Sequence, residues 1–265
     1  MQKLDGKSAF ITGAASGIGR AIAMSLAREG VAIAVADIDG EAAAKVCAQI
    51  ESAGGKAVAV VCDVTKEESL ATAADEASAT FGAIQILVNN AGAFAVAALE
   101  DTKRRDWEWL LEINVIGVVN GLHTFLPRMR AQDEACHIVN TASVSGHLPT
   151  PGLSIYTASK FAVVGLTECL RAELAETSIG VSVLCPGIVN TGLLASSRQH
   201  RPARHGAGAD GPSPMEAVIT QGSDPAELGD QVVAAIKAGE FYILTHPGIR
   251  PAFEKRFGDI LAAYP

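Results

Sequence analysis

Three residues whose side chains can move protons, Ser143, Tyr156 and Lys160, lie close together in the sequence. Tyr156 precedes Lys160 by four positions, so on a helix both side chains lie on one face and an ammonium group can sit beside the phenol. A free phenol has a pKa of about 10, and a neighbouring cation lowers that pKa toward neutral pH. Ser143 follows the apolar stretch 136–142, so its hydroxyl is expected at the carboxyl end of a buried strand. The three residues therefore predict acid–base chemistry on a bound small molecule.

A glycine-rich turn near the N-terminus supports this interpretation of the trio. The support is needed because any long amphipathic helix can place a tyrosine four residues before a lysine. The apolar stretch 8–12 is followed by Gly13, Gly17 and Gly19 and then by a helical pattern over 21–27. Such a strand, turn and helix bind a pyrophosphate, because glycines let the backbone approach and the helix N-terminus supplies N–H donors. The spacing is G-x-x-x-G-x-G, which differs from the usual dinucleotide motif G-x-G-x-x-G.

The composition favours one compact enzyme domain over residues 1–265 and argues against several other classes of protein. Hydrophobic residues make up 49% of the 265 residues, which is enough for a large core. The net charge of −8, without a basic run before residue 198, argues against nucleic-acid binding. We expect no membrane span and no signal peptide, and therefore a cytoplasmic protein. Five cysteines without a C-x-x-C pair predict reduced thiols and no metal site.

Short β-branched runs alternate with alanine-rich helical patterns along the chain. The intervening stretches are mostly long enough for crossover helices, which predicts a parallel sheet with helices on both faces. The runs 31–36 and 57–62 are apolar throughout, as strands covered on both faces are. The predicted strands are 8–12, 31–36, 57–62, 85–89, 136–142, 180–185 and 241–244.

Further landmarks follow in order along the chain: Thr12 before the glycine turn, Asn89 to Gly92, Asn114, the proton-moving trio, and Pro186-Gly187 with Thr191. Over about residues 7 to 192 they resemble the short-chain dehydrogenase/reductase family. The resemblance implies a doubly wound, Rossmann-like α/β domain that interconverts a secondary alcohol and a ketone by hydride transfer. It also implies a homo-oligomer, a dimer or tetramer, in which the helix around 107–129 contacts a second subunit. That helix is apolar nearly all round, and burial within one chain is the alternative.

The same resemblance assigns roles to four catalytic residues. Tyr156 as a phenolate takes the alcohol proton, and Ser143 hydrogen-bonds the substrate oxygen. Lys160 lowers the pKa of Tyr156 and holds the nicotinamide ribose. Asn114 bends its helix and holds a water that links Lys160 to solvent.

The predicted cofactor is NAD rather than NADP. Asp37 ends the strand 31–36, where a carboxylate accepts hydrogen bonds from ribose hydroxyls and repels a 2′-phosphate. Ile38 is uncharged, and Arg20 is expected to face outward. Asp63 and Val64 match the adenine contact of the family, although Thr65 and Glu68 also form a helix-capping pattern. The cofactor site is expected to contain Gly13, Ser16, Gly17, Ile18, Gly19, Asp37, Ile38, Asp63, Val64, Asn90, Ala91, Gly92, Tyr156, Lys160, Pro186, Gly187, Val189 and Thr191.

The substrate itself is less well defined by the sequence. A lid is expected near 190–222, with a mobile segment 195–214, and an amphipathic helix near 249–264 closes the cleft or packs on a partner. The arginines at 198, 201 and 204 either hold an anionic substrate or form solvated surface. A mainly apolar, cyclic or aryl-substituted substrate is expected to contact Ser143, His147, Leu148, Leu153, Tyr156, Leu193 and Leu194.

Other functions are weighed against this one. Enoyl reductases of the same superfamily separate the tyrosine and lysine by six residues, which this sequence does not. The extended epimerases and dehydratases carry a larger C-terminal domain, for which we expect no room here. An NADP-dependent carbonyl reductase is the alternative enzyme. A non-catalytic NAD-sensing or scaffold protein of the same fold is the alternative from another class.

Overall fold

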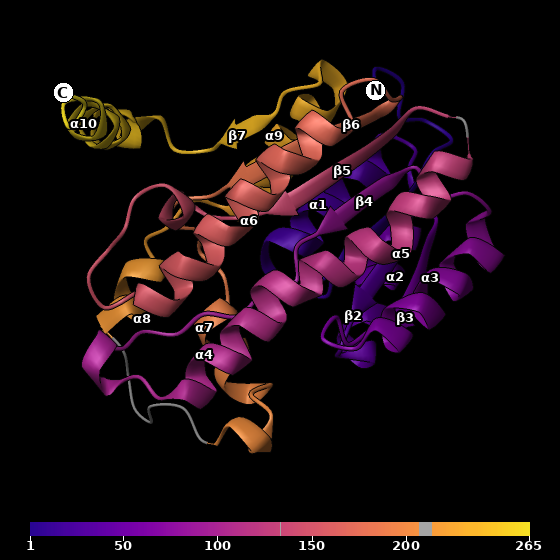
Figure 1. The fold of residues 1–265 in the computed structure, drawn as a ribbon. Helices are drawn as coiled ribbons and strands as arrows, with labels where there is room; N and C mark the ends of the chain where they lie inside the picture. The colour runs from indigo at the N-terminus through magenta and orange to yellow at the C-terminus, as the bar shows by residue number, and fades with distance from the viewer. Residues whose placement is uncertain (133, 207–213) are drawn as a thin grey trace.

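A parallel sheet of seven strands lies at the centre of the structure, a computed structural model that describes residues 1–132, 134–206 and 214–265 (Figure 1). The strand order is β3-β2-β1-β4-β5-β6-β7, so the direction of winding reverses between β1 and β4. This order confirms the predicted doubly wound, Rossmann-like fold, and each strand lies within one residue of its predicted bounds. The strands are β1 (Ser8–Thr12), β2 (Ala32–Asp37), β3 (Ala57–Val61), β4 (Ile86–Asn89), β5 (Cys136–Thr141), β6 (Ile179–Cys185) and β7 (Tyr242–Leu244).

Helices cover both faces of the sheet, which explains why the strands are apolar on both sides. Successive residues of β1 point to opposite faces: Phe10 packs under α3, α5 and α6, and Ile11 packs under α1, α2 and α9. Both side chains are fully buried. The helices are α1 (Gly17–Arg28), α2 (Gly40–Ser52), α3 (Glu67–Phe81), α4 (Arg104–Leu111), α5 (Gly117–Ala131), α6 (Ser154–Glu173), α7 (Leu193–Gln199), α8 (Pro214–Ile219), α9 (Pro225–Ala238) and α10 (Arg250–Leu261).

The helix predicted around 107–129 is interrupted. A π turn, η2 (Glu112–Ile116), separates α4 from α5 and contains Asn114. The whole segment Arg104–Ala131 is long and apolar enough to cross a membrane by length and composition alone. The expectation of no membrane span stays a prediction, because core helices of folded domains also meet this criterion. Half of its most apolar window is buried inside the fold, as in the core helix of a folded domain.

The C-terminal helix α10 extends away from the body of the molecule (Figure 1). None of its residues is buried, and Phe257 and Leu261 are exposed. Two of its side chains contact the body: the Phe253 ring centroid lies 5.2 Å from that of His147, and the Arg256 guanidinium lies 5.2 Å from the centre of the Phe161 ring. The predicted helix is therefore present, but only Ile249, just before it, lines the cavity described below.

Candidate active site

A cavity of about 760 Å³ opens at the carboxyl ends of the strands, over the point where the strand order reverses. Its wall contains every predicted cofactor residue except Gly19, together with Ser143. Gly19 lies just beneath the wall, where a Cβ atom would be 2.2 Å from the Gly13 carbonyl oxygen. The sequence-predicted residues from six different strand ends therefore meet at one cavity.

The glycine turn and the turn after β4 are joined by hydrogen bonds. The Thr12 hydroxyl oxygen accepts from the backbone N–H groups of Asn90 at 2.9 Å and Ala91 at 3.0 Å, and the Asn90 amide donates to the Gly13 carbonyl at 3.2 Å. Gly13 and Gly17 have φ of 63° and 53°, which side chains disfavour. A Cβ on Gly13 would lie 2.8 Å from the Ala91 Cα. Glycine is therefore required at these positions, as in a turn whose backbone N–H groups bind a pyrophosphate.

Asp37 faces this cradle from the end of β2. Its carboxylate accepts the backbone N–H of Ala15 in the glycine turn at 2.9 Å. Ile38, which is half exposed, also lines the cavity. Arg20 instead donates to the Gln49 side chain at 3.0 Å, away from the cavity wall. The charge beside the cradle is therefore an acid, which fits ribose hydroxyls and disfavours an added phosphate.

Asp63 lines the cavity after β3, and Val64 lies beside it. Burial alone would raise the pKa of the Asp63 carboxyl, but hydrogen bonds from Lys66 and Thr65 outweigh burial and lower it. The Thr65 hydroxyl donates to Asp63 at 2.7 Å, and the residue that caps α3 is Lys66. The alternative capping pattern of Thr65 with Glu68 is therefore wrong, because Asp63 takes the threonine hydroxyl.

The proton-moving trio surrounds one end of the cavity. Tyr156 and Lys160 both lie on α6, and the Lys160 ammonium is 5.7 Å from the centre of the tyrosine ring. The ammonium donates to the Thr141 carbonyl oxygen at 2.9 Å. The Ser143 hydroxyl donates to the Pro186 carbonyl oxygen at 3.3 Å and accepts the Ser145 N–H at 3.1 Å, and it lines the cavity with Tyr156. The predicted grouping of the three side chains is therefore present.

The protonation of this trio differs from the sequence-based prediction. Burial raises the pKa of Tyr156 to about 12, and its hydrogen bond with Ser143 opposes that rise. Burial also lowers the pKa of Lys160 to about 8. The net shift of the Tyr156 pKa is therefore upward because removal from water dominates it, while a lowering by Lys160 is not among its causes and stays a prediction.

Asn114 holds the turn after β4 in place. Its amide donates to the Ala93 carbonyl and to the Ser159 hydroxyl, both at 3.0 Å, and its oxygen accepts the Ala93 N–H at 2.7 Å. A Cβ on Gly92 would lie 3.2 Å from this oxygen and 3.6 Å from the Lys160 nitrogen. Asn114 itself is buried and does not line the cavity, and its link to Lys160 through a water stays a prediction.

The turn after β6 is supported by a histidine that the sequence did not reveal. The Gly187 N–H donates to the His246 ring at 3.0 Å, and a Cβ on Gly187 would lie 2.7 Å from that ring. Pro186, Val189 and Thr191 of this turn line the cavity. His246 lies 59 residues further along the chain from Gly187, and no local pattern marks it.

Four of the seven predicted substrate residues line the cavity: Ser143, Leu153, Tyr156 and Leu193. Leu148, Leu194 and His147 do not. The His147 ring packs on Phe253 and lies 3.5 Å from the Cys185 sulfur, so it faces the C-terminal segment. Leu194 is buried in a cluster with Trp109 and Leu110 beneath α7. Leu148 is half-buried outside the cavity wall.

The cavity wall contains several apolar residues that the sequence analysis does not predict. Phe94 stands edge-on to Tyr156 with ring centroids 4.7 Å apart. Trp109 and Ile113 lie one turn apart on α4 and η2, and this spacing within an apolar helix was the available signal. Met215 and Ile219 of α8 complete the apolar side of the cavity.

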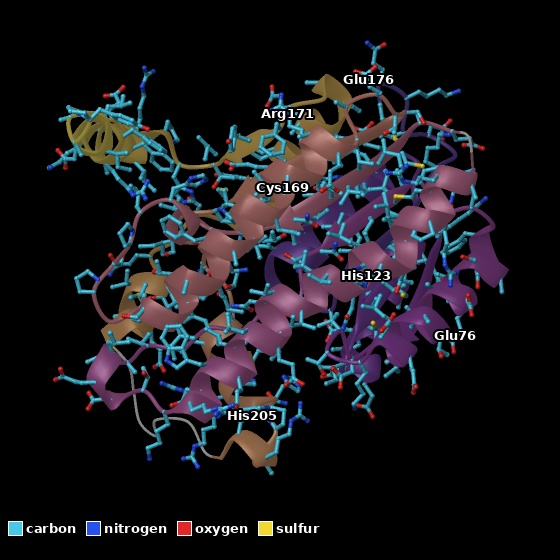
Figure 2. All side chains as sticks on the ribbon, in the orientation of Figure 1. Glu76, His123, Cys169, Arg171, Glu176 and His205 are labelled. Carbon is cyan, nitrogen blue, oxygen red and sulfur yellow. The ribbon has the colours of Figure 1, made fainter. Side chains whose placement is uncertain are left out.

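The predicted lid contains α7 and α8, and residues 207–213 lie outside the described part of the chain. Its three arginines are paired with acids, and Arg204 is half exposed and lines the cavity, so the two predicted roles, anion binding and solvated surface, stay predictions. Arg201 is the most buried, and its guanidinium lies 4.5 Å from the centre of the Trp109 ring. Figure 2 shows His205 at this end of the molecule, where its ring lies 3.3 Å from Glu112. The pairs are Arg198–Glu216, Arg201–Asp106 and Arg204–Glu112.

The cysteines carry no sign of reactivity. Cys169 is exposed on α6, and the other four are buried (Figure 2). Burial raises the pKa of the Cys185 thiol, beside the active site, to about 12. Within the described ranges, no three histidine, cysteine or acidic side chains are grouped as metal ligands.

Comparisons with known proteins agree with this geometry. A sequence model described as short chain dehydrogenase matches residues 7–202. The crystal structure of a short-chain dehydrogenase/reductase from Burkholderia phymatum in complex with NAD is 38% identical, with a TM-score of 0.92 over 99% of this chain and 96% of that one. A dehydrogenase/reductase of CLA biosynthesis from Lactiplantibacillus plantarum is 37% identical over 98% of this chain and 95% of its own length. A cyclohexanol dehydrogenase from an Acinetobacter species is 37% identical over 73% of this chain and 77% of its own length.

The matched region contains the glycine cradle, the Asn90 turn and the trio of Ser143, Tyr156 and Lys160. The chain therefore belongs to the short-chain dehydrogenase/reductase family, whose members are oxidoreductases that depend on a nicotinamide cofactor.

Proposed function

We propose that the protein is an NAD-dependent dehydrogenase that interconverts a secondary alcohol and a ketone. One observation carries the proposal: Ser143, Tyr156 and Lys160 lie at the end of a cavity whose other wall is the glycine cradle. A protein that only sensed NAD would need the cradle but not a buried tyrosine beside a buried lysine. The name of the cyclohexanol dehydrogenase relative supports alcohol chemistry.

The residues of the cavity fit a dinucleotide. The backbone of Gly13 to Gly17 would hold the pyrophosphate, and Asp37 would bind the hydroxyls of the adenosine ribose. Val189 and Thr191 would hold the nicotinamide amide. Thr191 lies over the cradle, since its methyl group is 3.3 Å from where a Cβ on Gly17 would be. When bound, the nicotinamide supplies the hydride-accepting carbon and, in its oxidised form, a positive charge.

Tyr156 is the proposed acid–base group. In alcohol oxidation its phenolate accepts the hydroxyl proton, and in ketone reduction the neutral phenol returns a proton to the carbonyl oxygen. Ser143 donates a hydrogen bond to the same oxygen and stabilises the charge that develops there. Both side chains line the same cavity, so both can reach one substrate oxygen.

Lys160 is proposed to act through its charge and its position. Burial brings its pKa to about 8, so the ammonium exists at neutral pH but loses its proton more readily than an exposed lysine. Its bond to the Thr141 carbonyl fixes the ammonium beside the tyrosine ring. From there it would also reach the nicotinamide ribose.

The substrate is proposed to be largely apolar, with a ring or an aryl group. Phe94, Leu153, Leu193, Met215 and Ile219 line the part of the cavity beside Tyr156 and the lid. We further propose a cytoplasmic homo-oligomer, either a dimer or a tetramer. Exposed apolar residues on η2 and α10, such as Ile116 and Phe257, support contact with a second subunit.

The proposed function is tested by mixing the enzyme with NAD and a panel of alicyclic and aryl secondary alcohols and following NADH formation. The Tyr156→Phe variant is the matched control. We expect NADH from the wild type alone. NADH formation by both proteins, or binding of NADH without oxidation of any alcohol in the panel, would contradict the proposal.

A further inference from the structure

Helix α7 lines the cavity with a stripe of four residues and, beside the stripe, with Ala195 and Gln199. Leu193, Ser196, Ser197 and His200 recur at spacings of three and four residues, and all four line the cavity. On a helix these positions form one stripe. Three of them belong to α7, and His200 is the residue that ends the helix. The lid therefore presents a short stripe of defined side chains to whatever the cavity holds.

The ring of His200 is held in one orientation. Its Nδ1 atom lies 3.1 Å from the Ser196 carbonyl oxygen and 3.3 Å from the Ser196 hydroxyl. A carbonyl oxygen only accepts hydrogen bonds, so Nδ1 carries the proton. In the neutral ring the other nitrogen, Nε2, then carries a lone pair and accepts. Among the described residues, Nε2 has no hydrogen-bonding partner.

The position of α7 places His200 away from the cofactor anchors. The N-terminal end of α7 adjoins Thr191, whereas Ser197, further along, accepts the Phe94 N–H at 2.9 Å. Phe94 in turn stands against Tyr156. His200 lies another turn onward, about 10 Å along the helix axis from Leu193 at a rise of about 1.5 Å per residue. It therefore faces the end of the cavity that is remote from Thr191.

Two charged side chains of the described part of the lid are paired with acids. Arg198 pairs with Glu216 at 2.7 Å, and Arg204 pairs with Glu112 at 2.8 Å. The His205 ring accepts from Arg204 at 3.0 Å. The cavity wall contains apolar side chains such as Trp109 and Ile219, and also Gln199 and Arg204, which are near His200 in the sequence. His200 thus offers an acceptor to a chamber with a partly apolar wall.

We propose that His200 is a specificity-determining residue: its Nε2 accepts a hydrogen bond from a hydroxyl group at the end of the substrate remote from the reacting carbon. The inference deepens the proposed function and rests on it. The substrate class is a secondary alcohol, or its ketone, with an apolar ring that carries a distal hydroxyl. A ligand that covers this acceptor without supplying a donor loses free energy, so ligands that supply the donor are favoured over isosteres that do not.

The test uses binding rather than turnover. Acetophenone, 4-hydroxyacetophenone and 4-methoxyacetophenone are titrated into the enzyme–NADH complex, and quenching of tryptophan fluorescence reports binding, since Trp109 lines the cavity. The methoxy compound keeps the oxygen at the same ring position but lacks the donor and is one CH₂ larger, while acetophenone lacks the group altogether. We expect the hydroxyl compound to bind about 10-fold more tightly than the other two.

Two variants test whether the preference for the hydroxyl ketone depends on His200. In His200→Asn the amide can still donate to the Ser196 carbonyl but does not reach the position of Nε2, so the preference should fall to within about twofold. In His200→Gln the longer side chain places an amide oxygen near that position and should restore part of the preference. Acetophenone and NADH affinities should stay within about twofold of wild type in both variants.

Equal binding of the three ketones by the wild type, binding of none, or an equal loss for all three in His200→Asn would overturn the inference. A selective loss of NADH affinity would also overturn it, because His200 would then serve the cofactor. Selective binding of the hydroxyl ketone without any hydride transfer would contradict the proposed function instead, while the His200 contact would stand.

Discussion

The two walls of the active-site cavity are built in opposite ways. The wall proposed for the cofactor consists of turns at strand ends, joined by hydrogen bonds between the Thr12 and Asn90 side chains and the neighbouring backbone. The lid wall consists of short helices held by side-chain pairs such as Arg201 with Asp106, which are 95 residues apart in the sequence. The first wall is fixed by the sheet itself. The second depends on a few ion pairs and ring contacts.

This difference explains what each wall can do. Turns that need glycine so that a ligand can approach the backbone tolerate few substitutions. Such turns therefore suit a single ligand that related enzymes share. A wall of paired side chains changes its shape when a single pair changes, without disturbing the sheet. We therefore expect cofactor binding to be robust to changes in the lid, and substrate selection to be sensitive to them.

The largest expected effect comes from Tyr156→Phe. The change removes the transferable proton, so kcat should fall by about 10³-fold or more, as expected for loss of a general acid–base group. NADH affinity should stay within a few-fold, because the cofactor wall is intact. Steady-state kinetics and NADH titration measure both quantities. A variant with kcat near that of wild type would refute the assignment.

The lid is tested by Arg201→Ala. Its guanidinium is buried between Asp106 and Trp109, and breaking a buried ion pair costs about 3 kcal/mol or more. We expect a lower melting temperature and a raised KM for substrate with an unchanged Kd for NADH. The matched control is Arg198→Ala, whose more exposed pair should contribute less than about 1 kcal/mol. Equal melting temperatures for the two variants would show that the lid does not depend on the buried pair.

Lys160→Met should affect both walls at once. The change keeps the length of the side chain but removes its charge, so we expect kcat to fall by about 10²-fold. The Kd for NADH should rise about 10-fold if the ammonium also binds the ribose. Separate measurement of kcat and of NADH affinity distinguishes the two roles. An unchanged NADH affinity would remove the ribose role and leave only the electrostatic one.

Asp37 and Ile38 give the smallest effect and the sharpest test of the cofactor wall. Asp37→Ala with Ile38→Arg should raise the NADP over NAD preference in kcat/KM by at least about 10-fold, or about 1.4 kcal/mol. Asp37→Asn is the control, since it keeps an acceptor for the Ala15 N–H but loses the charge. A wild-type enzyme that already prefers NADP would overturn the choice of cofactor.

The sequence predicted the cofactor wall closely because each of its turns has a local requirement. Gly13 and Gly17 take a backbone conformation that side chains disfavour, and Asp37 follows directly from the end of a strand. The order of such turns along the chain sets their order in space, since parallel strands bring all their carboxyl ends to one edge.

The lid and the supporting contacts were predicted poorly because they join distant parts of the chain. His246 supports Gly187, and His147 turns toward Phe253, although neither contact has a pattern in the sequence. The pKa of Tyr156 was predicted in the wrong direction for a similar reason. Proximity to Lys160 is visible in the spacing, whereas the depth of burial depends on the whole fold.

Direct transfer of the label from NADH tests the central claim. NADH deuterated at C4 is incubated with the enzyme and a panel of aryl and alicyclic ketones, and the product alcohols are analysed by mass spectrometry and NMR. We predict deuterium on the carbinol carbon with the wild-type enzyme and none with Tyr156→Phe. Equal label transfer by the two proteins, or transfer from deuterated NADPH but not from deuterated NADH, would contradict the account.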